Sequence, residues 1–474
     1  MLKTIFILLF AGSCGLLSAM SDFNVKNFGA KGDGDADDAP AIQKAIDAAQ
    51  VNGGCVYFPA GSYRVKKTLE IGGNSAADPN LNWLTLRGEG GGSKLLGDGV
   101  EFILAGRSNP GSKSPWMNGA RIEGLTFRSF DLKNRCGAID LSLMLRVFIT
   151  SCNFVRCKAG IVSEREFTPY SDPQKKNNGH SVWIVRIHDC IFSGNADWSI
   201  SIRRAFDVVI TNNSIEHGSG GIRIGFIEDA KDAACNTLRI ENNVIEGLNA
   251  HGKAAVKLCC VVGGRIAGNY FEANPSGDIE ITPGKGGWFR GCIIAANTFQ
   301  PTAKQKATGI YGPIRIEKAI DVTICNNFTT GPRLIHSDSR PLGRNVVVFG
   351  NTMGNPASLG FGGATEAERK AYERFVAANK MNRNRFILGG QAGHIGIDTN
   401  RGIVFSENAI SYSDRIPETG NPGDVVFCKK PAVENGRVVI GWYCVTGGKE
   451  PRWCPLSFST EEMKQPDTKK EGKK

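Results

Sequence analysis

The sequence repeats itself along most of its length. Nine units each begin with Ile or Val and carry a second, mostly apolar residue five positions later, and successive units lie 23 to 38 residues apart. The first column consists of Ile122, Ile149, Ile187, Ile210, Ile240, Ile266, Ile294, Ile324 and Val348. The second consists of Phe127, Phe154, Phe192, Ile215, Ile245, Phe271, Phe299, Thr329 and Met353. Thr329 breaks the second column, and we expect Phe328 to fill the gap. Repeat periods of about 20 to 50 residues indicate a solenoid.

The residue types within each unit favour strands over helices. The apolar runs are short, rich in Ile, Val and Phe, and broken by Gly and Asn. A helical repeat of this length would need two amphipathic stretches in every unit, and the units contain none. The sequence therefore predicts an all-β parallel β-helix in which each unit is one coil and coils stack about 4.8 Å apart.

A third column stands three residues after the first. It begins with Leu125, Cys152 and Cys190 and continues as Asn213, Asn243, Asn269, Asn297, Asn327 and Asn351. Asn tolerates left-handed backbone angles, and its amide can bond the amides above and below it. We expect this column to form an inward amide ladder that serves the scaffold, with the cysteines acting as small buried residues.

The beginning of the chain predicts export. Residues 1–20 combine Lys3, an apolar run and small residues before Ala19, which is typical of a signal peptide, and the run is too short to span a membrane. The segment around Cys14 also resembles a lipoprotein signal. The expected location is therefore secreted, periplasmic or at the cell surface, and no later segment is predicted to cross a bilayer.

The region that follows resembles a known family. Asp38 is expected to cap a helix that has Pro40 in its first turn and covers the open end of the solenoid. The motifs FGAKGDG, DD, AIQKAIDAA and GG-x-V-x-FP-x-G-x-Y between Phe23 and Val65 resemble the N-terminal part of pectate-lyase-superfamily proteins. That superfamily includes rhamnogalacturonase-like and epimerase-like enzymes and phage tailspikes. The resemblance implies a right-handed β-helix, but it does not settle the activity.

The repeat stops after Met353. A capping box at Thr365 and Glu368 predicts a helix, and the short strands that follow resemble a small β module at the ends of phage fibre proteins. The expected organisation is a signal peptide at 1–20, a capped β-helix at 21–360, a helical linker at 361–385, a β module at 386–460 and a disordered, lysine-rich tail at 461–474. In the related modules the position of Cys444 is commonly Cys, whereas the positions of Cys428 and Cys454 are not. A disulfide between Cys428 and Cys454 is therefore expected, with a Cys444–Cys454 bridge as the alternative.

The charge of the chain suggests a class of partner. The net charge is +11, and basic proteins attract polyanions. For an exported β-helix, an acidic polysaccharide is a more plausible polyanion than nucleic acid, although a generally basic surface would give the same charge. Neither a metal site nor a phosphate-binding glycine loop is indicated by residue spacing, so no cofactor is expected.

One strand in each coil carries charged residues that are expected to point outward. The middle residues of SIRR, GIRIG, AVKLC, DIEIT and PIRIE are Ser201, Arg223, Lys257, Glu280 and Arg315. Because neighbouring residues point inward, these residues should form an outward column. The strip from Arg223 to Arg315 would be about 14 Å long and could bind an extended acidic sugar chain. The alternative is a solvated face in which Glu280 offsets its neighbours.

Candidate catalytic groups lie elsewhere in the repeat. Glu216, Glu246 and Glu272 stand one residue past the second column, where repulsion between carboxylates would favour a protonated general acid or a cation site. The alternative is that these acidic residues are structural punctuation. Polygalacturonase-type hydrolases carry NTD, DD, GHG and RIK motifs, of which only Asp197 and His251 survive here. A lyase would need a group that neutralises the uronate carboxylate and a base, and His217 and His251 join Arg223 and Lys257 as candidates.

Two functions remain open at this point. The first is an exported carbohydrate-active enzyme, a polysaccharide lyase or a glycoside hydrolase, that cleaves or modifies an acidic polysaccharide in a groove along the β-helix. The second is a non-catalytic glycan-binding or surface-attachment protein on the same fold. By analogy with tailspikes, the chain could assemble as a homotrimer.

Overall fold

The computed structural model describes the β-helix and the strands of the C-terminal region. The described residues are 22–51, 53–72, 83–106, 117–142, 144–163, 182–226, 235–249, 252–282, 289–307, 311–317, 319–331, 334–336, 343–349, 351–353, 385–389, 395–398, 402–405, 408–413, 415–416, 418, 425–434, 437–446 and 451–459. The expected signal peptide, the capping box at Thr365 and the tail after residue 460 lie outside them. No helix within the described ranges is long and apolar enough to cross a membrane.

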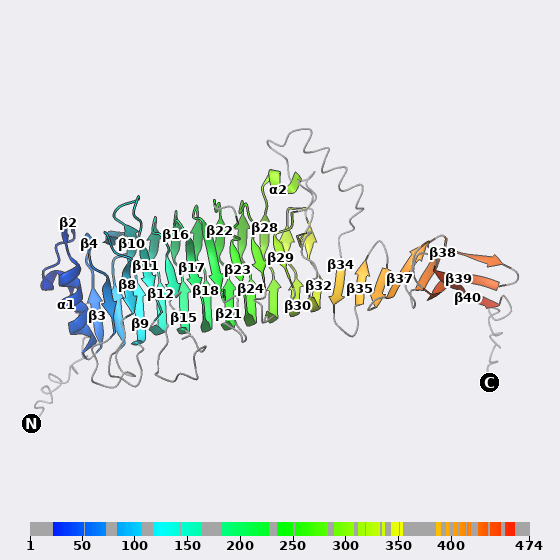
Figure 1. Cartoon of the computed structure of the whole chain (residues 1–474), viewed down its shortest axis with the longest axis horizontal. Coiled ribbons are helices and arrows are strands. Elements are labelled where there is room, and N and C mark those ends of the chain that lie inside the picture. The colour runs from blue at the N-terminus through cyan, green and yellow to red at the C-terminus, as the bar shows by residue number, and fades with distance from the viewer. Residues whose placement is uncertain are drawn as a thin grey trace, which may run out of the picture. The chain divides into compact units, whose positions relative to one another are not determined.

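The chain divides into two compact units, Met1–Ser219 and Gly220–Lys474. Both contain coils of a right-handed parallel β-helix, in which each complete coil contributes one strand to each of three sheets, here called A, B and C (Figure 1). Within each unit the neighbouring strands of a sheet are parallel and in register.

The first unit begins with a cap and continues with coils. The cap contains η1 (Val25–Phe28) and α1 (Ala39–Gln50), and η2 (Gly90–Gly92) precedes β7. Sheet A contains β1 (Asp22–Asn24), β3 (Gly54–Tyr57), β6 (Leu84–Arg87), β9 (Met117–Glu123), β12 (Met144–Thr150), β15 (Val182–His188) and β18 (Ala205–Thr211). Sheet B contains β2 (Asp33–Asp37), β4 (Gly61–Val65), β7 (Ser93–Gly97), β10 (Thr126–Ser129), β13 (Asn153–Val155), β16 (Ile191–Ser193) and β19 (Ser214–Glu216). Sheet C contains β5 (Leu69–Ile71), β8 (Phe102–Gly106), β11 (Gly137–Asp140), β14 (Ile161–Ser163) and β17 (Trp198–Ile202).

The second unit contains further coils and the C-terminal strands. Sheet A contains β21 (Cys235–Glu241), β24 (Val261–Ala267), β27 (Arg290–Ala295), β30 (Ala319–Cys325) and β32 (Gly343–Phe349). Sheet B contains β22 (Val244–Glu246), β25 (Tyr270–Glu272), β28 (Thr298–Gln300), β31 (Phe328–Thr329) and β33 (Thr352–Met353). Sheet C contains β20 (Gly220–Ile224), β23 (Val256–Leu258), β26 (Ile279–Ile281) and β29 (Ile314–Ile316), and the short helix α2 (Ala303–Ala307) follows β28. The mainly antiparallel C-terminal strands are β34 (Arg385–Gly389), β35 (Ile395–Asp398), β36 (Gly402–Phe405), β37 (Asn408–Ser413), β38 (Val425–Glu434), β39 (Arg437–Thr446) and β40 (Arg452–Ser459).

The first two predicted columns stack inside the coils. In each unit the column of Ile and Val residues lies in register on sheet A and the second column lies in register on sheet B. The rings of Phe154 and Phe192 stack with centroids 4.6 Å apart, and those of Phe271 and Phe299 with centroids 5.1 Å apart. Full burial of such a side chain stabilises the fold by roughly 1.5–3 kcal/mol. Thr329 itself occupies the buried position, whereas Phe328 aligns with the half-buried Thr298, so the prediction that Phe328 fills the gap was wrong.

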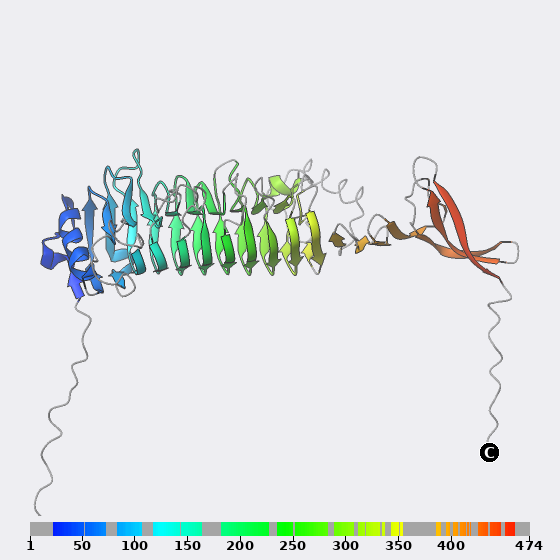
Figure 2. The ribbon, with the colours of Figure 1, turned by 60° about the horizontal axis from the view of Figure 1, so that its bottom comes forward.

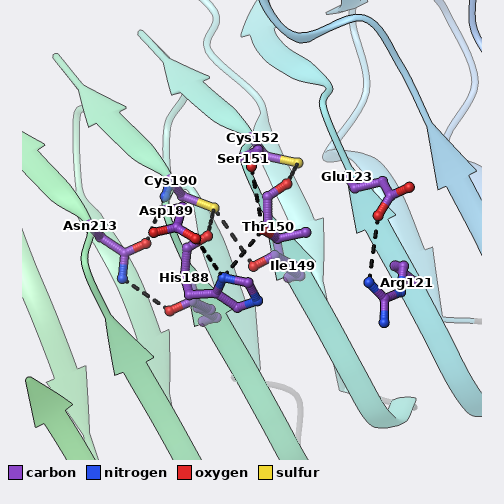
Figure 3. A network of polar contacts seen from close by, with 11 residues as sticks. Arg121, Glu123, Ile149, Thr150, Ser151, Cys152, His188, Asp189, Cys190 and Asn213 are labelled. Carbon is purple, nitrogen blue, oxygen red and sulfur yellow. Dashed lines mark hydrogen bonds and ion pairs between the residues drawn. The ribbon is translucent and has the colours of Figure 1, made fainter.

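The third column forms the predicted ladder, with cysteines in the role of asparagine at its start. The side-chain Nδ2 of Asn213 donates to the carbonyl oxygen of Ile187 one coil earlier, over 3.0 Å. The thiol of Cys190 lies 3.7 Å from the carbonyl oxygen of Ile149 in the equivalent position (Figure 3). We expected the ladder residue itself to have left-handed backbone angles. Instead, the residue before it does, as at Asn212 (φ 57°).

A second column of left-handed residues was not foreseen. It lies three positions before the first column, within the strands of sheet A, at Gly119, Arg146, Ile184, Asp207, Thr237, Gly263, Gly291 and Asp321. Each such residue is left out of the strand pairing, while the residues on both sides of it remain paired, as at a β-bulge. A bulge stacked on a bulge keeps the strands parallel and in register.

The N-terminal cap differs from the prediction at Asp38. This buried side chain makes no capping bond to α1 and instead accepts hydrogen bonds from the main-chain N–H groups of Lys31, over 2.6 Å, and Gly32, over 3.0 Å. Asp37 accepts from the N–H of Ala39. The Asp-Asp pair therefore holds the loop of the FGAKGDG motif against the start of the helix.

The predicted disulfide between Cys428 and Cys454 is not formed. Cys428 lies on β38 and Cys454 on β40, and β39 separates the two strands. A disulfide needs Cα atoms within about 7 Å, and two strand spacings already amount to about 9.6 Å. The alternative bridge from Cys444 to Cys454 is also absent, since Cys454 lies opposite Tyr443 and Cys444 opposite Trp453.

Candidate functional site

The charged column predicted on the third strand of each coil lies on sheet C of the second unit. Arg223, Lys257, Glu280 and Arg315 are paired in register on β20, β23, β26 and β29. The residues on both sides of each, such as Ile279 and Ile281 around Glu280, are almost fully buried, whereas the charged residues are half-buried or exposed. The strict alternation therefore turns the four charged side chains outward, and we call them the sheet C strip.

The charges of the strip are partly matched among themselves. Lys257 Nζ lies 3.0 Å from Glu280 Oε1, and these side chains are 31% and 14% exposed. The guanidinium carbon of Arg223 lies 3.8 Å from the ring centroid of Phe226, an arrangement in which the ring face attracts the cation. With three cations and one carboxylate, the strip carries a net positive charge, and this charge points to an anionic ligand.

Ser201 does not continue the strip outward. It lies on β17 in the first unit, and all five residues of that strand are buried, with Ser201 fully so. The prediction that its side chain points to solvent was wrong.

The candidate acidic residues lie on a different sheet from the strip. Glu246 and Glu272 end β22 and β25 and are neighbours in register on sheet B. The hydroxyl of Tyr270 donates to Glu272 Oε2 over 2.7 Å. Burial, followed by the hydrogen bond to Glu272, raises the pKa of Tyr270 to about 12. The second unit thus presents one acidic face and one largely cationic face on separate sheets.

The remaining candidates belong to the first unit or lie outside the description. Glu216 ends β19, and His217 follows it with a left-handed backbone (φ 54°) and a 69% exposed side chain, its Nδ1 3.9 Å from Glu216 Oε2. Asp197 is half-buried before β17, and its main-chain N–H donates to the carbonyl oxygen of Lys158. His251 lies outside the described residues. Among the described residues, no group of three or more His, Cys, Asp or Glu side chains could hold a metal ion.

A buried polar cluster beside the strip escaped the sequence analysis. Asp278, which directly precedes β26, is 2% exposed and accepts hydrogen bonds from Asn274 Nδ2, over 2.8 Å, and the Tyr311 hydroxyl, over 3.2 Å. Burial raises the pKa of Asp278 to about 7. Gln305 of α2 donates to the carbonyl oxygen of Asn274 over 2.8 Å. This cluster ties α2 to the coil that carries Glu280, and the only sequence signal for it was the proximity of Asn274 to Asp278.

Comparisons with known proteins agree with this fold. The family model described as rhamnogalacturonase A/epimerase, pectate lyase-like, matches residues 23–249. A tailspike protein of Acinetobacter baumannii phage AM24 is similar in structure, with a TM-score of 0.57 and 20% identity over 71% of this chain and 55% of the tailspike. Just under half of the chain thus matches a pectate-lyase-like family, and the β-helix fold is shared with the tailspike.

Two curated relatives have names that describe different functions. Mannuronan C5-epimerase AlgE4 of Azotobacter vinelandii is 45% identical over 124 residues, 26% of this chain and 19% of the epimerase. Plasmin and fibronectin-binding protein A of Streptococcus pneumoniae is 31% identical over 153 residues, 28% of this chain and 20% of that protein. The chain thus matches about a fifth of the length of either relative.

Proposed function

We propose that the protein is an exported enzyme that binds and modifies an acidic polysaccharide along the sheet C strip. The observation that carries the proposal is the in-register stacking of Arg223, Lys257 and Arg315 on the outer face of one sheet. Strands lie about 4.8 Å apart, so the strip offers charge at steps comparable to the length of one sugar unit. The similarity to a mannuronan epimerase supports a uronate polymer as substrate.

The chemistry follows from what cations do to a uronate. A guanidinium or ammonium group that binds the carboxylate stabilises the negative charge that develops when the C5 proton is removed. Return of a proton to the opposite face of C5 gives the epimer. Loss of the 4-linked sugar oxygen instead breaks the chain and leaves a double bond between C4 and C5. In the second unit, Lys257 and Arg315 flank Glu280 and would contact the carboxylates, and Glu280 would orient Lys257 through their ion pair.

A panel of acidic polysaccharides tests the enzymatic proposal. Purified protein is incubated with polymannuronate, polygalacturonate and sulfated glycans. Ultraviolet absorbance of the unsaturated uronate reports a lyase, new reducing ends without it report a hydrolase, and a changed uronate composition by NMR reports an epimerase. If activity is found, single replacements of Lys257, Glu280 and Arg315 follow, and at least one should lower the rate by about a hundredfold or more. Glu246→Gln and Glu272→Gln are the controls, because these residues lie on sheet B, away from the strip. Activity on none of the polymers contradicts the proposal.

The second candidate function is glycan binding without catalysis at a cell surface. The ion pair between Lys257 and Glu280 fits this function, because a lysine that is held by a neighbouring carboxylate can still contact an anionic ligand at a binding surface. Similarity to the plasmin and fibronectin-binding protein A of Streptococcus pneumoniae supports binding without catalysis, although the partners in that name are proteins. Retention of a polyanionic glycan together with no product from any polymer would select this function over the enzyme.

A further inference from the structure

The outer face of sheet A in the first unit carries a group of exposed aromatic side chains. Trp83, Trp183 and Phe206 are 46%, 53% and 37% exposed, and Phe148 is half-buried. Trp183 and Phe206 are neighbours in register, with ring centroids 6.0 Å apart, and Trp83 and Phe148 have centroids 5.9 Å apart. We call these four residues the aromatic platform. Exposed apolar groups that gather on one face, and are not scattered singly, mark a binding surface.

The backbone is shaped to seat the platform. Gly119 lies in the left-handed region, with φ of 88°, and a Cβ atom there would come within 2.6 Å of the Trp83 ring. The absence of that side chain lets the indole lie directly over the strand. Arg121, on the same strand β9, places its guanidinium carbon 5.9 Å from the ring centroid of Phe148. The rings of Trp83 and Phe148 are thus packed against the strand on the surface of the protein.

Several of the charged groups among the rings are paired with one another. Arg186 Nη2 lies 2.6 Å from Asp207 Oδ2, and Arg121 Nη1 lies 3.6 Å from Glu123 Oε2. His188 Nδ1 lies 2.9 Å from Asp189 Oδ2 (Figure 3). Exposed Arg87 and Arg146 lie on the same sheet, so the face keeps some positive charge. Its carboxylates Glu123, Asp189 and Asp207 stand beside the cations, however, and would repel a polyanion. The face offers flat apolar rings surrounded by fixed hydrogen-bonding groups.

We propose that the aromatic platform is a second glycan-binding site, which takes neutral polysaccharides by stacking sugar rings on Trp83 and Trp183. A pyranose ring has an apolar face of C–H groups and a rim of hydroxyls. The apolar face fits an aromatic ring, and the rim fits the paired carboxylates and guanidiniums beside it. The parallel strands of sheet A (Figure 2) repeat at about 4.8 Å, so consecutive sugars can meet consecutive coils. This site is independent of the sheet C strip and of any catalysis there.

A second copy of the chain is a poorer fit to the same face. Association through the platform would bury the ion pairs Arg186–Asp207 and Arg121–Glu123 between the copies, and taking paired charges out of water costs free energy. A glycan leaves the outer edges of these pairs in contact with water and replaces part of their hydration with hydroxyls.

Affinity electrophoresis of the full chain in gels that contain dextran, a mixed-linkage β-glucan or a galactomannan tests the platform. Retardation by at least one of these neutral polymers is expected, and added salt should leave it unchanged, because no charge on the ligand is screened. Trp183→Ala and Trp83→Ala should each weaken binding about tenfold, the scale of one lost stacking contact. Trp183→Phe should retain most of the binding, whereas Trp183→Leu should not.

Phe130→Ala is the matched control, since Phe130 is 43% exposed but follows β10 of sheet B, away from the platform. It should bind as the unaltered protein does, and thermal unfolding should confirm that all variants fold. Variants that lack the cations of the sheet C strip should keep neutral-glycan binding. The proposal is overturned if no neutral polymer is retained, or if the tryptophan variants bind normally. It is also overturned if sedimentation shows self-association that Trp183→Ala abolishes.

Discussion

At the scale of single residues, the ladder amides stabilise the coils through several bonds each. Asn297 Oδ1 accepts from the main-chain N–H of Asn269, over 3.0 Å, and from Asn269 Nδ2, over 2.9 Å. Its own Nδ2 donates to the carbonyl oxygen of Ile266 and to Asn327 Oδ1. All of these groups are buried, so the loss of one amide leaves main-chain partners in neighbouring coils unsatisfied.

Replacing Asn297 with Ala should therefore lower the free energy of unfolding by about 3 kcal/mol, the cost of leaving buried main-chain groups without partners. Asn236→Ala is the matched control, because Asn236 lies on a strand of sheet A and is only half-buried. Denaturant unfolding followed by circular dichroism measures both. Equal effects of the two substitutions would contradict the structural role of the ladder.

Asp278 makes stability depend on pH. Its pKa is raised from 3.8 to about 7 by burial, so the folded state holds the proton over a range in which the unfolded chain has lost it. Stability is therefore greatest below pH 3.8 as far as this group is concerned, and it falls as the pH rises toward about 7. Asp278→Asn keeps the shape and removes the titration. As the pH rises from 3.8 to about 7, the midpoint temperature of the unaltered protein should therefore fall relative to that of the variant. A constant difference would show that Asp278 does not titrate there.

Some residue positions could be predicted from the sequence and others could not. The inward columns were predictable because burial demands the same residue type in every coil, from Ile122 to Val348. The left-handed column in sheet A was not, because it is filled by residues as different as Arg146, Ile184 and Gly263, so no residue type repeats. Asp38 was misassigned because a carboxylate before a helix usually caps it, whereas here the side chain accepts from two main-chain N–H groups of the preceding loop.

At the scale of elements, sheet alternation decides which predicted site residues lie together. It places Arg223, Lys257, Glu280 and Arg315 on one face because each is flanked by buried aliphatic residues, a pattern visible in the sequence. The same reasoning failed for Ser201, because β17 is covered on both faces. The aromatic platform was missed because Trp83 and Trp183 lie where sheet A strands begin and are not repeated in other coils.

The position of charge on sheet C, and not the overall charge of +11, should determine binding of a polyanion. Replacing Arg223, Lys257 and Arg315 together with Ala should weaken retention on immobilised polymannuronate by about a hundredfold or more, since each cation contributes roughly 1 kcal/mol. The matched control replaces Arg239, Arg265 and Arg290, which are exposed on sheet A of the same unit and remove the same charge. Equal losses in both variants would mean that the basic surface acts as a whole.

At the scale of the whole molecule, assembly and location stay predictions. A trimer would have three times the mass of the chain, and light scattering coupled to size-exclusion chromatography measures it directly. A single mass equal to that of one chain at all concentrations would contradict a homotrimer.

Secretion is tested by fractionating cells that express residues 1–474, with a variant that lacks residues 1–20 as the control. The two proteins appearing in the same compartment would contradict the signal peptide.

A polyanionic glycan is expected to bind along the sheet C strip. The most direct measurement is the dissociation constant for polymannuronate as a function of salt, for the unaltered protein and for the variant that lacks Arg223, Lys257 and Arg315. Exposed charges are screened within about 8 Å at physiological ionic strength, so affinity should fall steeply with salt in the unaltered protein. In the variant, affinity should already be low and should depend only weakly on salt. Equal affinity and equal salt dependence in the two proteins would contradict the account.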